Sequence, residues 1–149
     1  MLLFDVNILA YAHRVELPQH PKIGPWLTRI INGPQAFGIS DIVLSGFVHV
    51  VTHPKVFATP SPIEKALAFC NVLREHPNAV LTAPGPRHWD IFARLCADAR
   101  ARGNLVPDAF LAALAIESGS EWITCDRGFG RFPNLQWRDP LSMTAFPAP

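Results

Sequence analysis

The sequence predicts an α/β domain with a mainly parallel central sheet, on three observations. Short apolar runs alternate with helix-like segments, which is the pattern of strands joined by helical crossovers. The first run, LLF at 2–4, is continuously apolar, as expected of a strand buried on both faces. The 149 residues are 49% hydrophobic and 17% charged, which suits one packed domain and excludes a disordered chain. We therefore expect a single domain over 1–141 and a loose tail over 142–149.

The expected elements alternate along the chain. The apolar runs that predict strands lie at 2–4, 36–40, 79–82, 121–125 and 135–137. The patterns that predict helices lie at 8–13, 22–32, 41–51, 62–76, 86–102 and 105–118. Pro25 interrupts the second of these helical patterns, so we expect that helix to begin there.

Local signals mark two helix starts. Ser61, Pro62 and Glu64 supply an N-cap serine, a proline in the first turn and a capping-box glutamate. Gly103 ends one helix, and Asn104 is the expected N-cap of the next.

The helix expected over 86–102 has two distinct faces. Its expected core-facing stripe consists of Trp89, Phe92, Ala93, Cys96 and Ala97. Asp90, Arg94, Asp98 and Arg102 follow at four-residue steps and form a solvated ladder of opposite charges. His88 is interpreted as a surface residue.

Composition and cysteine usage indicate the compartment. Thirteen basic and twelve acidic residues give a net charge of +1, so no strong overall field points to a partner. The three cysteines are scattered, which favours a reducing environment over a disulfide framework. The opening segment contains Asp5 and lacks a basic leader, and the apolar run at 109–116 is too short to span a membrane. We expect a cytoplasmic protein.

Three aspartates are expected at one edge of the sheet. Asp5 directly follows the run at 2–4, and Asp126 directly follows the run at 121–125. Asp108 lies in the first turns of the helix expected over 105–118. In parallel sheets, ligand sites form beyond the carboxyl ends of the strands. Carboxylates gathered there repel one another, and Mg²⁺, which prefers oxygen ligands, would resolve the conflict and favour phosphodiester hydrolysis.

A second interpretation stays open for these residues. An aspartate after a strand is commonly a turn former or a helix N-cap, and for Asp5 or Asp126 alone this interpretation is the better one. The conjunction of three acids favours a site, but their spacing does not decide between the two.

Three segments carry a family resemblance: DVNIL at 5–9, GNLVPDAFLAALAIE at 103–117 and TCDRGF at 124–129. They resemble the PIN-domain family, specifically the VapC-type toxins of bacterial toxin–antitoxin pairs. LSGFVHVVTHPKVF at 44–57 and the later RFPNLQW resemble one branch of those toxins. The resemblance implies a three-layer α/β/α sandwich, a Mg²⁺- or Mn²⁺-dependent ribonuclease, a homodimer and inhibition by a cognate VapB-type antitoxin.

The resemblance assigns roles to five residues. Asp5, Asp108 and Asp126 match three family acids, which would be catalytic and would hold the metal. Asn7 and Thr124 match polar residues that would hold those carboxylates in place.

Two departures from the family pattern leave the number of metal ions open. Gly46 and Gly128 stand where the family usually has acids. Asp41 could compensate for Gly46, but we favour it as the N-cap of its helix.

Basic residues near the same edge are candidates for RNA binding. Arg87, Arg127 and Arg131 carry forked guanidinium groups that suit phosphates. A toxin of this kind would act on a single-stranded loop, where bases can splay out. His49 and His53 share a helical face and offer a zinc alternative, although no third ligand is evident.

The leading hypothesis is a Mg²⁺-dependent endoribonuclease toxin in which a water attacks the phosphodiester and leaves a 5′-phosphate and a 3′-hydroxyl. The alternative is a catalytically weakened PIN-like module that binds RNA or antitoxin without turnover.

Overall fold

The computed structural model describes residues 1–142, and within them five strands form one sheet. The strands are β1 (Leu2–Phe4), β2 (Phe37–Ile39), β3 (Ala79–Leu81), β4 (Glu121–Ile123) and β5 (Trp137–Arg138). The helices are α1 (Val6–His13), α2 (His20–Ile31), α3 (Asp41–Val51), α4 (Ile63–Arg74), α5 (His88–Asp98) and α6 (Leu105–Ser118), with a 3₁₀ turn η1 (Arg127–Arg131). Apart from Ser142, the expected tail lies outside the described residues.

The sheet has the strand order β3-β2-β1-β4-β5, and all four of its pairings are parallel. This confirms the expected α/β class. From β1 the chain moves outward through β2 to β3 and then returns across the sheet to β4. The direction of winding therefore reverses between β1 and β4, and ligand sites of open α/β sheets form at such a switch point.

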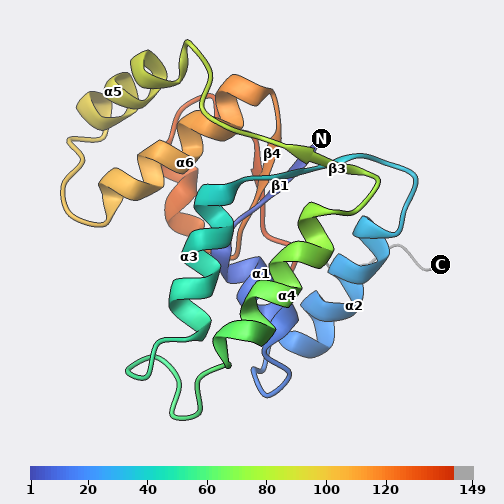
Figure 1. Cartoon of the computed structure of the whole chain (residues 1–149). Helices are drawn as coiled ribbons and strands as arrows, with labels where there is room; N and C mark the ends of the chain where they lie inside the picture. The colour runs from blue at the N-terminus through green and yellow to red at the C-terminus, as the bar shows by residue number, and fades with distance from the viewer. Residues whose placement is uncertain (143–149) are drawn as a thin grey trace.

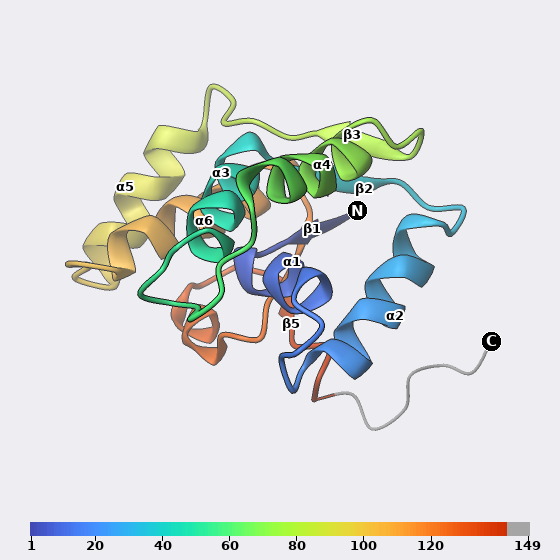
Figure 2. The same ribbon diagram turned by 60° about the horizontal axis from the view of Figure 1, so that its bottom comes forward.

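Helices cover both faces of the sheet, because right-handed crossovers on the outward path place α1 to α4 together and the return path places α5 and α6 opposite. In agreement, α1 packs on α2 and α3, while α5 packs along α6. Figure 1 and Figure 2 show α5 and α6 side by side, away from α2 and α4. No helix among residues 1–142 is long and apolar enough to cross a lipid bilayer.

Helix α2 begins at His20, so the expectation that it begins at Pro25 is wrong. Pro25 is exposed, and the neighbouring side chains of Ile23, Trp26 and Leu27 are buried in the core. Burial of this face stabilises the helical turn that the proline alone would disfavour.

The expected capping box at the start of α4 is also wrong. The N-cap position belongs to Pro62, and no side chain caps the helix. Ser61 is buried and its hydroxyl instead lies 3.0 Å from His13 Nε2 and accepts from Arg14 Nη1 at 2.9 Å. The serine therefore ties the end of α1 to the start of α4.

Helix α5 ends at Asp98, and its expected core-facing stripe is only partly correct: Phe92 and Cys96 pack against the core, whereas Ala93 and Ala97 are exposed. Trp89, which was expected in the core, is 67% exposed, whereas His88 is only 3% exposed. The His88 ring lies 4.2 Å from the ring of Phe110, and its Nε2 lies 3.0 Å from the Phe110 carbonyl oxygen. The close antiparallel neighbour α6 selects the buried face, and this neighbour is not visible in the periodicity of α5 alone.

The burial of His88 and the exposure of Trp89 predict that truncating the histidine destabilises the protein more than truncating the tryptophan. We expect His88→Ala to lower the free energy of unfolding by about 2–4 kcal/mol, because it leaves a cavity and removes a buried hydrogen-bonding group. Trp89→Ala should cost less than about 1 kcal/mol, because most of the indole is in solvent. Urea unfolding of the two variants measures both values, and a larger loss for Trp89→Ala would contradict the described packing of α5.

Candidate functional site

Asp5 lies at the switch point between β1 and β4. Its backbone N–H donates to the Ile123 carbonyl at 2.9 Å, which extends the pairing of the two strands. The residue is only 6% exposed. Its Oδ1 accepts from the Val6 N–H at 2.7 Å, so Asp5 is the N-cap of α1. The carboxylate is thus fixed by the strand before it and the helix after it.

Thr124 and Asn7 hold the other oxygen of Asp5. The buried Thr124 hydroxyl donates to Asp5 Oδ2 at 2.6 Å, and Asn7 Nδ2 donates to the same atom at 2.9 Å. Thr124 Oγ1 also accepts from Asn7 Nδ2 at 3.0 Å and from the Asp126 N–H at 3.0 Å. The Thr124 hydroxyl therefore connects Asp5 with the backbone of Asp126.

The other two acids reach this edge from separate elements. Asp126 is exposed, and its Oδ1 accepts from the Gly128 N–H at 2.7 Å, which makes it the N-cap of η1. Asp108 is half-buried in the first turn of α6. Asn104 occupies the N-cap position of that helix, although its side chain makes no capping hydrogen bond.

The three carboxylates influence one another. Burial raises the pKa of Asp5 to about 6, against the hydrogen bonds from Thr124 and Val6, and the charges of Asp108 and Asp126 raise it further. Burial also raises the pKa of Asp108. The negative charge of Asp126 raises this pKa further, whereas the positive charge of Arg131 lowers it. The capping interpretation of Asp5 and Asp126 is therefore confirmed, and the charge of Asp126 also raises the pKa of the other two acids. That these acids hold a metal ion stays a prediction.

The acids do not form a closed metal cage. Among residues 1–142, no three His, Cys, Asp or Glu side chains lie close enough to surround one ion. Mg²⁺, however, is commonly held by one or two carboxylates, with waters completing its shell. An all-oxygen donor set that includes one buried acid fits an ion held in this way. It does not fit a site in which the protein supplies every ligand.

Sequence reasoning missed two side chains near these acids. Asp139 follows β5 at the same sheet edge. Burial, together with the nearby Asp139 carboxylate, raises the pKa of the Cys125 thiol to about 12. Tyr11 lies one turn after Asn7 on α1, and burial together with Cys125 and Asp5 raises its pKa. A strand-end position for Asp139 and the i, i+4 spacing of Asn7 and Tyr11 were the available signals.

The candidate arginines are divided between two places. Arg127 and Arg131 lie on η1 directly after Asp126, and Arg131 Nε donates to the Gly128 carbonyl at 3.0 Å. Arg87 lies elsewhere, so its expected position at this edge is wrong. Its N–H donates to Glu117 Oε1 at 2.8 Å, nine residues and about 13 Å along α6 from Asp108.

The two glycines at usual family acid positions both lie near the site. A Cβ on Gly46 would meet Val6 Cγ2 at 2.9 Å, because α3 approaches α1 closely beside Asp5. A Cβ on Gly128 would lie 2.9 Å from Asp126 Oδ1. A larger side chain at either position would require its neighbour to move.

Asp41 does not replace the missing acid at position 46. The N-cap of α3 is Ser40, so the expected cap at Asp41 is wrong. The Asp41 carboxylate accepts two hydrogen bonds from Arg74, at 2.8 and 3.1 Å, and this contact lowers its pKa. His49 and His53 lie with ring centroids 5.3 Å apart, but no third ligand joins them among residues 1–142.

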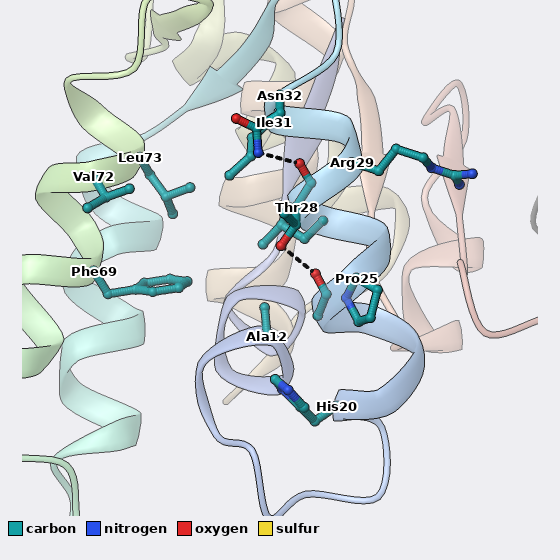
Figure 3. Close-up of a pocket in the computed structure, with 12 residues that line it drawn as sticks. Ala12, His20, Pro25, Thr28, Arg29, Ile31, Asn32, Phe69, Val72 and Leu73 are labelled. Carbon is teal, nitrogen blue, oxygen red and sulfur yellow. Dashed lines mark hydrogen bonds between the residues drawn. The ribbon is translucent and has the colours of Figure 1, made fainter. Parts of the chain in front are cut away.

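A separate groove of about 580 Å³ lies between α2 and α4 (Figure 3). Figure 3 shows Phe69, Val72 and Leu73 on one wall and Thr28 on the other. No carboxylate lines it, so its apolar character sets it apart from the acidic sheet edge.

Residues 2–135 match the sequence pattern of the PIN domain. The chain belongs to the PIN-domain family. It is 43% identical to the VapC ribonuclease Mb2897 of Mycobacterium bovis over 141 residues, which cover 95% of this chain and 96% of that protein. It is 37% identical to the ribonuclease VapC25 of Mycobacterium tuberculosis, over 91% of this chain and 96% of the relative.

Solved structures of PIN-domain toxins share the fold. The VapBC2 complex of Rickettsia felis, bound to a DNA fragment from its promoter, matches with a TM-score of 0.67 and 18% identity over 92% of this chain and 96% of that chain. The Mycobacterium tuberculosis toxin VapC20, described as cleaving the sarcin-ricin loop, matches with a TM-score of 0.65 and 14% identity over 91% of this chain and 99% of that one.

The raised pKa of Asp5 predicts that Asp5→Asn stabilises the fold, by an amount that depends on pH. Between about pH 4 and 6 the folded protein binds more protons than the unfolded chain, so its stability falls as the pH rises through this window. The shift corresponds to a loss of roughly 3 kcal/mol of folding stability at neutral pH. Asp5→Asn removes this loss, but it also alters the hydrogen bond with Asn7, which offsets part of the gain. We expect Asp5→Asn to raise the free energy of unfolding by about 1–3 kcal/mol at pH 7.5, and by progressively less towards pH 4.

Urea titrations between pH 4 and 8 test this expectation, with the exposed Asp90→Asn as the control. A variant less stable than the unaltered protein at pH 7.5 would contradict the burial of an ionised Asp5.

The Thr124 hydroxyl predicts a second pair of variants. We expect Thr124→Val to lower the free energy of unfolding by about 1–3 kcal/mol, because it removes one of the two side-chain donors to the buried Asp5 Oδ2 and leaves the Asp126 N–H without its acceptor. Thr124→Ser keeps the hydroxyl and should recover most of this loss. Equal losses for both variants, measured by urea unfolding, would show that methyl packing and not hydrogen bonding matters here.

Proposed function

We propose that this chain is a metal-dependent endoribonuclease toxin of the VapC type, which cleaves RNA phosphodiester bonds and is neutralised by a VapB-type antitoxin. The observation that carries the proposal is the buried Asp5 at the β1–β4 switch point, coupled by charge to Asp108 and Asp126. Relatives over most of the chain are named VapC ribonucleases, which supports the same reaction.

Asp5, Asp108 and Asp126 are the residues that would hold Mg²⁺ or Mn²⁺, one or two of them directly and the rest through waters of the ion's shell. Such an ion supplies Lewis-acid stabilisation of the phosphate charge and lowers the pKa of a bound water. Thr124 and Asn7 keep Asp5 in one orientation, so that little reorganisation accompanies binding. Arg127 and Arg131 stand beside the acids, where they would contact RNA phosphates.

The partners follow from the same proposal. A VapB-type antitoxin is supported by the VapBC complexes among the structural neighbours. A single-stranded RNA loop would be the substrate and a homodimer the active form, as the family resemblance implies. Three free thiols suit the reducing cytoplasm, where cellular RNA is met.

Gly46 and Gly128 favour a second candidate function, a weakened PIN-like module that binds RNA or antitoxin without turnover. Both positions lack the acids usual for the family, and the carboxylates present do not close around one ion among residues 1–142. Cleavage measurements separate the two functions.

We expect the purified chain to cleave total cellular RNA with Mg²⁺ or Mn²⁺ and not with EDTA. Asp108→Asn and Asp126→Asn should each lower the rate at least about 100-fold, because each removes a charge that holds the ion. Asp90→Asn, on the exposed face of α5, is the matched control and should cleave normally.

Melting temperatures give a readout independent of catalysis. A tenfold excess of Mn²⁺ over its dissociation constant adds about 1.4 kcal/mol, which should raise the Tm by a few degrees in the unaltered protein and less in Asp108→Asn. A Tm shift without cleavage favours the weakened module. The absence of both a Tm shift and cleavage would reject the metal site itself.

A further inference from the structure

The loop between α5 and α6, residues 99–104, lies at the end of α6 that carries Asp108. The Arg102 carbonyl accepts from the Leu105 N–H at 3.3 Å, so the loop leads directly into the first turn of α6. The Ala101 N–H donates to the Cys96 carbonyl at 2.8 Å, which ties the loop back to α5. Figure 1 shows the two helices side by side with this loop joining them. The loop is therefore tied to both helices and lies at the end of α6 whose first turn carries Asp108.

Arg100 in this loop has a backbone φ of +48°, in the left-handed region. A side chain with a Cβ costs roughly 1–2 kcal/mol there, whereas glycine is accommodated freely. Local folding therefore favours glycine at this position, and indeed Gly103, three residues later, has a φ of +58°. An exposed arginine at Arg100 is not explained by the stability of the turn, and such positions are typical of functional sites.

The guanidinium groups of Arg100 and Arg102 are exposed and have no ion-pair or hydrogen-bond partner within residues 1–142. Two other arginines, by contrast, are engaged: Arg74 binds Asp41, and Arg138 binds Glu121. Two uncommitted cations next to a helix that carries a site acid are free to bind an external anion.

The charges at the site indicate which anion the two loop arginines would bind. Asp5, Asp108 and Asp126 repel a polyanion, and a metal ion would neutralise them only where the reacting phosphate lies. The phosphates on either side need other cations, and arginine forks bind phosphate oxygens in a bidentate manner. Arg131 acts on Asp108 from η1, and the loop arginines directly precede the helix that carries the same acid.

We infer that Arg100 and Arg102 bind the phosphates of the RNA strand that flank the cleavage position. This inference rests on the proposed ribonuclease function. It assigns phosphate binding to these two arginines, at the end of α6 that carries Asp108, in place of the expected Arg87, which lies by Glu117 at the other end. The contacts are to the backbone, so they add affinity without selecting a base sequence.

Binding of a fluorescein-labelled, single-stranded 20-nucleotide RNA of mixed sequence tests the inference, measured by anisotropy in EDTA so that no cleavage occurs. We expect R100Q/R102Q to weaken binding at least about tenfold at low salt, and to reduce the slope of log affinity against log salt by about 1.4. The weakening should be similar for RNAs of unrelated sequence. The full chain is used throughout.

The matched control is K55Q/K65Q, which removes two exposed charges from the α3–α4 region and should retain nearly normal binding. Equal losses of RNA binding in the two double variants would show that only the net charge of the protein matters, and would overturn the inference. Normal RNA binding by R100Q/R102Q would also overturn it. A loss confined to antitoxin binding would overturn it as well.

Arg100→Gly separates a binding role from a structural one. It should leave the Tm unchanged or higher while weakening RNA binding, because glycine relieves the left-handed conformation. A lower Tm would assign Arg100 to the turn and overturn the inference. Failure of the unaltered chain to cleave with metal would reject the proposed function alone, provided that RNA binding still depends on the two arginines. Failure to bind RNA at all would reject both.

Discussion

The burial of an ionisable carboxyl group between two strands governs much of this molecule. Asp5 has little solvent around it, so its charge depends on the Val6 N–H, the Thr124 hydroxyl and the Asn7 amide. Those groups come from α1 and from the end of β4, which are separated by more than a hundred residues of chain. The pairing of β1 with β4 is therefore needed for the charge to be held at all, and fold and site depend on each other here.

The positions of the central strands β1, β2 and β4 could be predicted from the sequence, because a strand buried on both faces leaves a continuous apolar run. The acids that follow β1 and β4 were found by the same rule. The helix boundaries were harder to predict where packing outweighs local preference. Pro25 lies inside α2 because its neighbours are buried, and Ser61 bonds to α1 and not to its own helix.

The errors on α5 have a common physical origin. Periodicity identifies an apolar face, but it does not identify which neighbour covers that face, and α6 covers the side that carries His88. The same limit applies to side chains with long reach. Asp41 lies near the start of α3 as a cap would, yet its carboxylate is bound by Arg74 from α4, which no local pattern reveals. Arg87 was misplaced because the course of the segment after β3 is set by Glu117, on a distant helix.

The three acids differ in how firmly each is anchored, and this difference has a consequence for how the cluster responds to a cation. Asp5 and Asp126 are each fixed by hydrogen bonds from backbone N–H groups, whereas the carboxylate of Asp108 makes no hydrogen bond within residues 1–142. Asp108 is also carried by the α5–α6 hairpin, on the opposite side of the sheet from α1. Helix α6 itself is held in the core by buried alanines, so only the Asp108 side chain is left to turn about its own bonds. One carboxylate of the three can therefore reorient towards a bound cation while the two anchored carboxylates keep their hydrogen bonds.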